Sequence, residues 1–242
     1  MKLLKKHKYI LIITLILVVA VGAISVSNPT LQVTNEELTV SKLTEPIRIL
    51  QLTDLHNAEF GVDNTKLIAK CEEQNPDIIL MTGDLINMNE PDTDVATDLI
   101  RALTDIAPVY VSLGNHEIEN EQNFGTDCRE LFEEAGATVL EREYVDLVIE
   151  YQPIRIGGIY GYCLPEKFLK TNEADPEECA FLTDFQDTER YTILMCHMPV
   201  CWMINEGLDE WDIDCVFSGH AHGGQIILPF VGGLYAPDMG FF

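Results

Sequence analysis

The chain has 242 residues, of which 47% are hydrophobic and 23% charged, a balance typical of one folded domain with a short appendage. Its formal net charge of −25 argues against binding to a nucleic-acid duplex, because no basic surface would neutralise the phosphates. Most of the 40 acidic side chains are interpreted as a solvated surface, and only local context can assign a function to any of them.

The N-terminal region has the pattern of a membrane anchor. Residues 1–8 form a lysine-rich tail, and residues 9–26 are uncharged, with Thr14 and Ser25 as the polar side chains. A helix of about 18 residues spans roughly 27 Å, close to the ~30 Å hydrocarbon core of a bilayer. We expect an uncleaved single-pass anchor in the cell membrane, with a cleaved signal peptide as the alternative. The flanking lysines favour a cytoplasmic tail and an extracytoplasmic domain.

The seven cysteines argue partly against an extracytoplasmic domain. Their number is odd, the chain has no Cys-x-x-Cys pair, and several lie inside apolar runs, where a free thiol behaves as a small hydrophobic side chain. An oxidising compartment would endanger such a set. The side of the membrane on which the domain lies therefore stays open.

Beyond a polar connector at residues 27–46, short apolar runs alternate with helical patterns, so a folded domain is expected over residues 47–242. Strands are predicted at Arg48–Thr53, Asp77–Thr82 and Val109–Leu113, and helices at Asp63–Gln74, Thr93–Ala107 and Thr126–Ala135. This order predicts parallel strand pairs with helices packed on the sheet.

The second half of the domain is richer in β-structure. Strands are predicted at Thr138–Leu140, Tyr144–Tyr151, Ile154–Tyr160, Tyr191–Cys196, Asp214–Phe217 and Gln225–Leu228, with helical or irregular sequence before Gln186. The whole pattern favours an α/β (α+β) fold, a four-layer β-sandwich of two mixed sheets flanked by helices. Functional groups in such folds gather at the carboxyl ends of strands, and five of the six histidines are placed there.

The first three predicted strands each end in metal-ligand residue types. Asp54 and His56 lie two residues apart and face the same side of an extended chain. Asp84 follows Gly83, which permits a tight turn, and a carboxylate has two oxygens with which to bridge two cations. Gly114-Asn115-His116-Glu117 follows the third strand and offers an amide oxygen, an imidazole and a carboxylate.

Three more histidines follow later strands. His197 ends the run Leu194-Met195-Cys196, and His220 and His222 lie in a glycine-rich turn. A buried, hydrogen-bonded histidine is the simpler interpretation of His197 taken alone. Five such segments in this order, each at a predicted strand end, argue against coincidence.

This ordered series, D-x-H, G-D, G-N-H-E, H and G-H-x-H, resembles the calcineurin-like metallophosphoesterase superfamily over residues 47 to about 228. The N-terminal anchor and the trailing Gly-Gly-Gln look most like its bacterial, membrane-associated branch, which usually has Thr where this chain has Ala221. The resemblance implies that two divalent ions, Mn, Fe or Zn, are held by seven residues. One ion would be held by Asp54, His56 and His222, the other by Asn115, His197 and His220, and Asp84 would be shared.

The same resemblance implies a hydrolase in which a metal-activated water attacks a phosphomonoester or phosphodiester. His116, which has no metal role left to it, would protonate or stabilise the leaving oxygen. Glu117 has two interpretations: it orients His116, or it caps the turn that follows. The substrate is expected to be a phosphorylated small molecule, with a lipid-linked or envelope phosphate suggested by the anchor alone.

The chain ends at Phe242, soon after the last motif, and we therefore expect a C-terminally shortened domain with an exposed sheet edge. This raises an alternative function, a membrane-tethered metal-binding protein whose truncated phosphoesterase domain is inactive. The complete ligand set favours the enzyme. No oligomeric state is predicted.

Overall fold

The computed structural model describes Thr14, residues 31–161, 175–200 and 211–222, and the backbone of the strands at 226–228, 232–236 and 240–241. Among these residues, no helix has both the length and the apolar character needed to cross a membrane. The predicted anchor at 9–26 lies outside the described residues apart from Thr14, and it stays a prediction.

The first sheet is parallel throughout. Its strands lie in the order β1 (Ile49–Leu52), β2 (Ile78–Thr82), β3 (Val109–Ser112) and β4 (Thr138–Val139). The connections carry the 3₁₀ helix η1 (Val62–Asn64) and the helices α2 (Thr65–Glu73), α3 (Asp94–Thr104), α4 (Asn115–Phe124) and α5 (Cys128–Glu134). The prediction of two mixed sheets was wrong for this one, because each helical crossover returns the chain to the same end of the sheet.

The second sheet is mixed, as predicted. Its order is β5 (Glu143–Ile149), β6 (Gln152–Ile159), β7 (Tyr191–Cys196) and β8 (Cys215–Phe217). The hairpin of β5 and β6 is antiparallel, whereas β6, β7 and β8 run parallel to one another. The helix α7 (Pro176–Gln186) lies between β6 and β7 in the chain, and the Asp175 side chain caps it by accepting a hydrogen bond from Glu177 N at 2.9 Å.

A third, small sheet follows the last motif. The strands β9 (Ile226–Leu228), β10 (Gly232–Ala236) and β11 (Gly240–Phe241) pair antiparallel in the order β11-β10-β9. The strand predicted at Gln225–Leu228 corresponds to β9, but β10 and β11 were not predicted.

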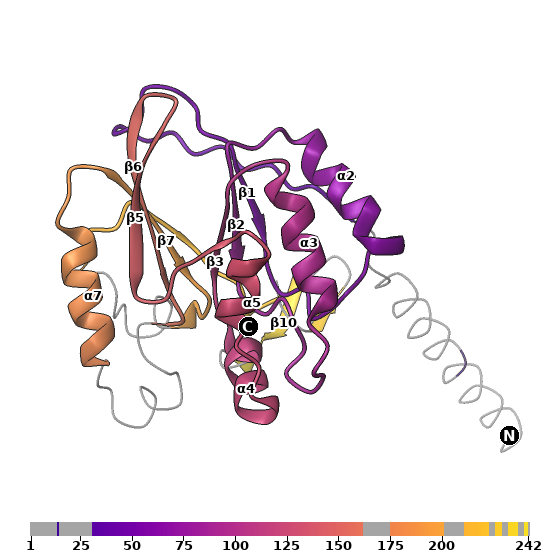
Figure 1. Ribbon diagram of the computed structural model, residues 1–242. Helices are drawn as coiled ribbons and strands as arrows, with labels where there is room; N and C mark the ends of the chain where they lie inside the picture. The colour runs from indigo at the N-terminus through magenta and orange to yellow at the C-terminus, as the bar shows by residue number, and fades with distance from the viewer. Residues whose placement is uncertain are drawn as a thin grey trace, which may run out of the picture.

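Three apolar layers hold the domain together. In β2, Ile79 and Met81 pack under α2, α3 and α5, whereas Ile78 and Leu80 face the second sheet. In β7, Met195 faces the first sheet, and Leu194 packs against α7. Helices therefore cover the outer faces of two stacked sheets, as Figure 1 shows with α2 and α3 on one side and α7 on the other. This is the four-layer arrangement predicted from the sequence.

The helix α4 was not predicted. Its sequence, NHEIENEQNF, has two apolar residues among ten and therefore no apolar periodicity. The helix starts at Asn115 because Glu117, in its first turn, accepts a hydrogen bond from Gly114 N at 2.7 Å. An acidic residue three positions after a turn glycine was a signal for this helix start.

The part of the connector that the structure describes, residues 31–46, lies on the domain. Leu31 packs against the layer beneath the helices, and Val40 and Leu43 pack against the layer between the sheets. The buried Gln152 side chain accepts hydrogen bonds from Thr44 N at 2.6 Å and Glu45 N at 3.1 Å. Residues 31–46 are therefore held against the domain by apolar packing and hydrogen bonds.

Among the described residues, Cys71, Cys128, Cys179 and Cys215 are free thiols. Burial raises the pKa of Cys71 to about 11 and, together with nearby carboxylates, that of Cys128 to about 12. Such thiols stay protonated and unreactive at neutral pH, which confirms their predicted role as small hydrophobic side chains for these two.

Candidate metal centre

All eight predicted site residues lie within the described part of the chain, and the structure brings them to one place. Five loops carry them, each leaving the carboxyl end of a parallel strand. Asp54 and His56 follow β1, Asp84 follows β2, Asn115 and His116 follow β3, His197 follows β7, and His220 and His222 follow β8.

The backbone of these loops is unusual. Five of the site residues have a positive φ, a conformation that costs non-glycine residues energy and persists where the surroundings enforce it. They are Asp54, His56, Asp84, His220 and His222, with φ between 48° and 65°. Backbone hydrogen bonds between loops supply that constraint: Asp54 N donates to Gly83 O and His56 N to Asp84 O, each at 3.0 Å.

The first group of ligand atoms joins the β1 and β8 loops. His56 Nε2 and His222 Nε2 are 3.1 Å apart, and their rings are stacked with an interplanar angle of 6°. His222 Nε2 also lies 3.5 Å from Asp54 Oδ1. His222 has 34% of its side chain exposed, compared with 23% for His56.

The second group joins the β2, β3, β7 and β8 loops. Asn115 Oδ1 lies 3.2 Å from His197 Nε2 and 3.0 Å from His220 Nδ1. His197 is fully buried, and its Nδ1 donates to Thr82 O at 2.7 Å. Because a carbonyl oxygen can only accept, the neutral His197 ring carries its proton on Nδ1 and presents a lone pair from Nε2.

Asp84 lies between the two groups. Its Oδ2 atom is 3.3 Å from His197 Nε2 and 3.9 Å from His56 Nε2. Burial raises the pKa of Asp84, but hydrogen bonding and the charge of His197 outweigh it, so the net pKa lies below its ordinary value. The carboxylate is therefore ionised, and it lies between the two groups of ligand atoms.

Both of these groups have the donor atoms to hold a metal ion, Asp54 with His56 and His222, and Asp84 with His197 and His220. The neutral His197 ring presents a lone pair from Nε2, and the Asn115 and Asp84 oxygens beside it also present lone pairs. The three atoms attract a cation, because none of them donates a hydrogen bond to the others. Burial lowers the pKa of His197, but the hydrogen bond and the negative charge of Asp84 raise it above its ordinary value, so this position favours positive charge. Imidazole, carboxylate and amide oxygen donors together suit Mn, Fe or Zn.

Comparison with known proteins agrees with this geometry. The sequence model of the calcineurin-like phosphoesterase family matches residues 47–224. This chain belongs to that family. An uncharacterized metallophosphoesterase of Campylobacter jejuni is 28% identical over 202 residues, which cover 83% of this chain and 50% of that protein. The phosphodiesterase YaeI of Escherichia coli is 27% identical over 203 residues, covering 79% of this chain and 66% of YaeI.

Among solved structures, TT1561 of Thermus thermophilus is similar, with a TM-score of 0.48 and 14% identity over 72% of this chain and 81% of that one. The chain spans about half to two thirds of the length of these curated relatives. Because the family model matches residues 47–224, the described domain is a phosphoesterase domain of the calcineurin-like family.

In this phosphoesterase centre, His116 has a defined orientation. Its Nδ1 accepts a hydrogen bond from Met88 N at 3.2 Å, and its Nε2 lies 4.0 Å from Asp84 Oδ2. Because a backbone N–H can only donate, the neutral His116 ring carries its proton on Nε2. His56 Nδ1 lies 3.1 Å from His116 Nδ1. Because His116 Nδ1 is an acceptor, His56 Nδ1 must donate to it, and the lone pair of His56 Nε2 is then available to a cation.

The Met88 contact was not predicted from the sequence. The donor is a main-chain N–H, which every residue except proline possesses, so the residue type carries no signal. The side chain of Glu117 caps α4 through Gly114 N, which favours the second of its two interpretations.

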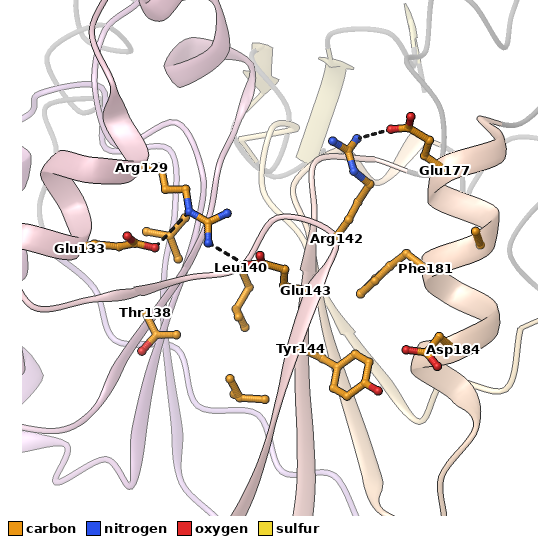
Figure 2. A pocket seen from close by; sticks show the side chains of 13 residues that line it. Arg129, Glu133, Thr138, Leu140, Arg142, Glu143, Tyr144, Glu177, Phe181 and Asp184 are labelled. Atoms are coloured by element: carbon orange, nitrogen blue, oxygen red, sulfur yellow. Dashed lines mark hydrogen bonds and ion pairs between the residues drawn. The ribbon is translucent and has the colours of Figure 1, made fainter.

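An open pocket of about 780 Å³ lies elsewhere, where β4 and β5 approach α7 (Figure 2). Its two arginines are already paired, Arg129 with Glu133 and Glu143, and Arg142 with Glu177. None of the eight site residues lines this pocket. The phosphoesterase centre is thus a different place from this hollow of the described surface.

Close packing at Gly114 yields a test of the centre. A Cβ atom there would overlap Asp84 Oδ1 and lie 2.5 Å from Asp84 N. We expect Gly114→Ala to weaken Mn²⁺ binding by at least roughly tenfold in isothermal titration calorimetry, since the carboxylate must move. The φ of Gly114, −104°, is allowed for alanine, so the effect comes from space alone.

Gly125→Ala, at the other end of α4, is the control. A Cβ there meets nothing within 4 Å, although its φ of 74° strains an alanine. It should lower the free energy of unfolding by about 1 kcal/mol and leave Mn²⁺ binding unchanged. Equal metal affinity in both variants would contradict the close packing around Asp84.

Proposed function

We propose that this chain hydrolyses phosphoric esters with two divalent ions, bound on either side of Asp84. The observation that carries the proposal is the position of Asp84 Oδ2, within 4 Å of a histidine nitrogen from each group. Asp54, His56 and His222 would hold one ion, and Asn115, His197 and His220 the other. When bound, such ions supply positive charge to the phosphate oxygens and lower the pKa of a coordinated water.

Three histidines determine how the substrate is oriented in the centre. A phosphate approaches from the side of His222, whose side chain is partly exposed, while the fully buried His197 closes the interior side. His116 directs its Nε2 proton into the centre and donates it as a hydrogen bond to the leaving oxygen. The charge that develops on that oxygen as the ester bond breaks is thereby stabilised.

The proposed substrates include both classes of phosphoric ester. YaeI of Escherichia coli is named a phosphodiesterase, which supports a phosphodiester, and a phosphomonoester fits the same centre. We add a lipid-linked or envelope phosphate on the strength of the N-terminal anchor. The alternative function is a membrane-tethered protein that binds metal but hydrolyses no ester. Metal binding without turnover would contradict the proposed hydrolase activity.

The first test removes the shared ligand. Purified full chain, stripped with EDTA and reloaded with Mn²⁺, should hydrolyse bis(p-nitrophenyl) phosphate and p-nitrophenyl phosphate at measurable rates. Asp84→Asn keeps the volume but not the charge, and should lower kcat/KM by more than the roughly 10–100-fold typical of residues outside the ligand set. A folded, metal-loaded wild-type chain that turns over neither ester would favour the inactive binding protein.

The role of His116 has a separate signature. His116→Ala, measured at saturating Mn²⁺, should lower kcat for phenyl esters by roughly 100-fold or more, because phenolate needs stabilisation as it leaves. The loss should be smaller for p-nitrophenyl esters, whose leaving group is already stable. Equal losses with both leaving groups would show that His116 acts elsewhere in the reaction.

We further propose that residues 9–26 anchor the domain to the cell membrane, with the domain extracytoplasmic. The full chain should remain with membranes after alkaline carbonate washing, whereas a variant lacking residues 1–30 should not, because the apolar segment supplies the affinity. A mature N-terminus near Ala23, found by mass spectrometry, would instead indicate a cleaved signal peptide. Protease added to spheroplasts should digest the domain if it lies outside.

A further inference from the structure

One buried carboxylate next to the metal centre does more than cap a helix. Glu117 is 1% exposed, and its two oxygens accept four backbone hydrogen bonds. Oε1 accepts from Leu85 N at 2.8 Å and Ile86 N at 3.1 Å, and Oε2 accepts from Asp84 N at 2.9 Å and Gly114 N at 2.7 Å. All four lone-pair directions of the carboxylate are thus used by main-chain donors.

These bonds join two different loops. Three of the donors lie in the loop after β2, which carries Asp84, and the fourth lies directly before Asn115 in the loop after β3. A further hydrogen bond joins the same two loops: His116 N, after β3, donates to the side chain of Asp84, after β2, at 2.9 Å. The relative position of Asp84 and Asn115 therefore depends on a closed ring of hydrogen bonds that includes Glu117.

The β2 loop needs such a restraint. Gly83 and Asp84 have φ values of 86° and 54°, and an aspartate in this region is strained. Two ligand residues of the first group depend on the same segment, since Asp54 N and His56 N donate to the carbonyls of Gly83 and Asp84. A shift of this segment would move ligands on both sides of the centre together.

We propose that Glu117 is a positioning residue for the metal pair, holding Asp84 where both ions share it. This inference rests on the proposed two-metal function. Glu117 touches neither the ligand atoms nor the substrate side; it acts through the backbone of Asp84 and through Gly114. Without it, each loop keeps its own ligands, but Asp84 loses the fixed place from which it reaches both groups.

Glu117→Gln is the sharpest variant, because it preserves shape and volume. It replaces one acceptor oxygen with an NH₂ group, which then faces two backbone N–H donors and cannot accept from them. Glu119→Gln, on the same helix but exposed, makes the same change of charge away from the loops and is the matched control.

The measurement uses the full chain, stripped of metal and titrated with Mn²⁺. Calorimetry gives the dissociation constants, and electron paramagnetic resonance distinguishes an exchange-coupled manganese pair from single ions. We expect Glu117→Gln, folded by circular dichroism, to bind Mn²⁺ roughly 10–100-fold more weakly and to lose the coupled signal. Glu119→Gln should match the wild type in both.

A folded Glu117→Gln protein with wild-type constants and the coupled signal would overturn the proposal. If that variant does not fold, Glu117→Asp decides: it keeps the charge but draws both oxygens back by one methylene. A folded Glu117→Asp protein with a weakened coupled signal supports positioning, and one that matches the wild type overturns it. A wild-type chain that binds a coupled pair but hydrolyses no ester refutes the proposed function and leaves this inference standing.

Discussion

The apolar layer between the two sheets sets how closely their loops approach. Ile78 and Leu80 of β2 meet Ile193 and Met195 of β7 in this layer, so the carboxyl ends of β2 and β7 leave the sandwich side by side. The hydrogen bond from His197 to Thr82 O crosses between the sheets at this edge. Both groups of ligand atoms depend on this packing, because both sheets contribute residues to each group.

The electrostatics of the centre follow from that proximity. Two carboxylates, Asp54 and Asp84, lie among histidine nitrogens and an amide oxygen, and the main-chain groups of Met88 and Thr82 decide which nitrogens carry protons. His197 therefore presents a lone pair from Nε2, and His116 presents an Nε2–H to a leaving oxygen. The overall charge of −25 is of little help here, since exposed carboxylates are screened by salt and only the buried ones act at short range.

Much of the fold was predictable because its elements have clear periodicity. The strands at the core, the helices α2, α3 and α5 and the four layers match the predictions to within a few residues. The errors have physical causes. α4 has a polar sequence, so only its capping residues indicate it, and the direction of each strand pair depends on where the crossovers return. The helix predicted from Asp63 begins at Thr65, after Asn64, which has a left-handed backbone.

The sequence by itself determined which donor atoms this protein offers, because the residue types at the strand ends carry them. The order of these residues along the chain identifies the family. Tertiary structure alone decided which atoms meet. Asp84 faces both ligand groups, Met88 N–H orients His116, and Glu117 ties two loops through four main-chain donors. The reason is that these relations run through backbone groups and distances between loops, and such groups are the same in every residue.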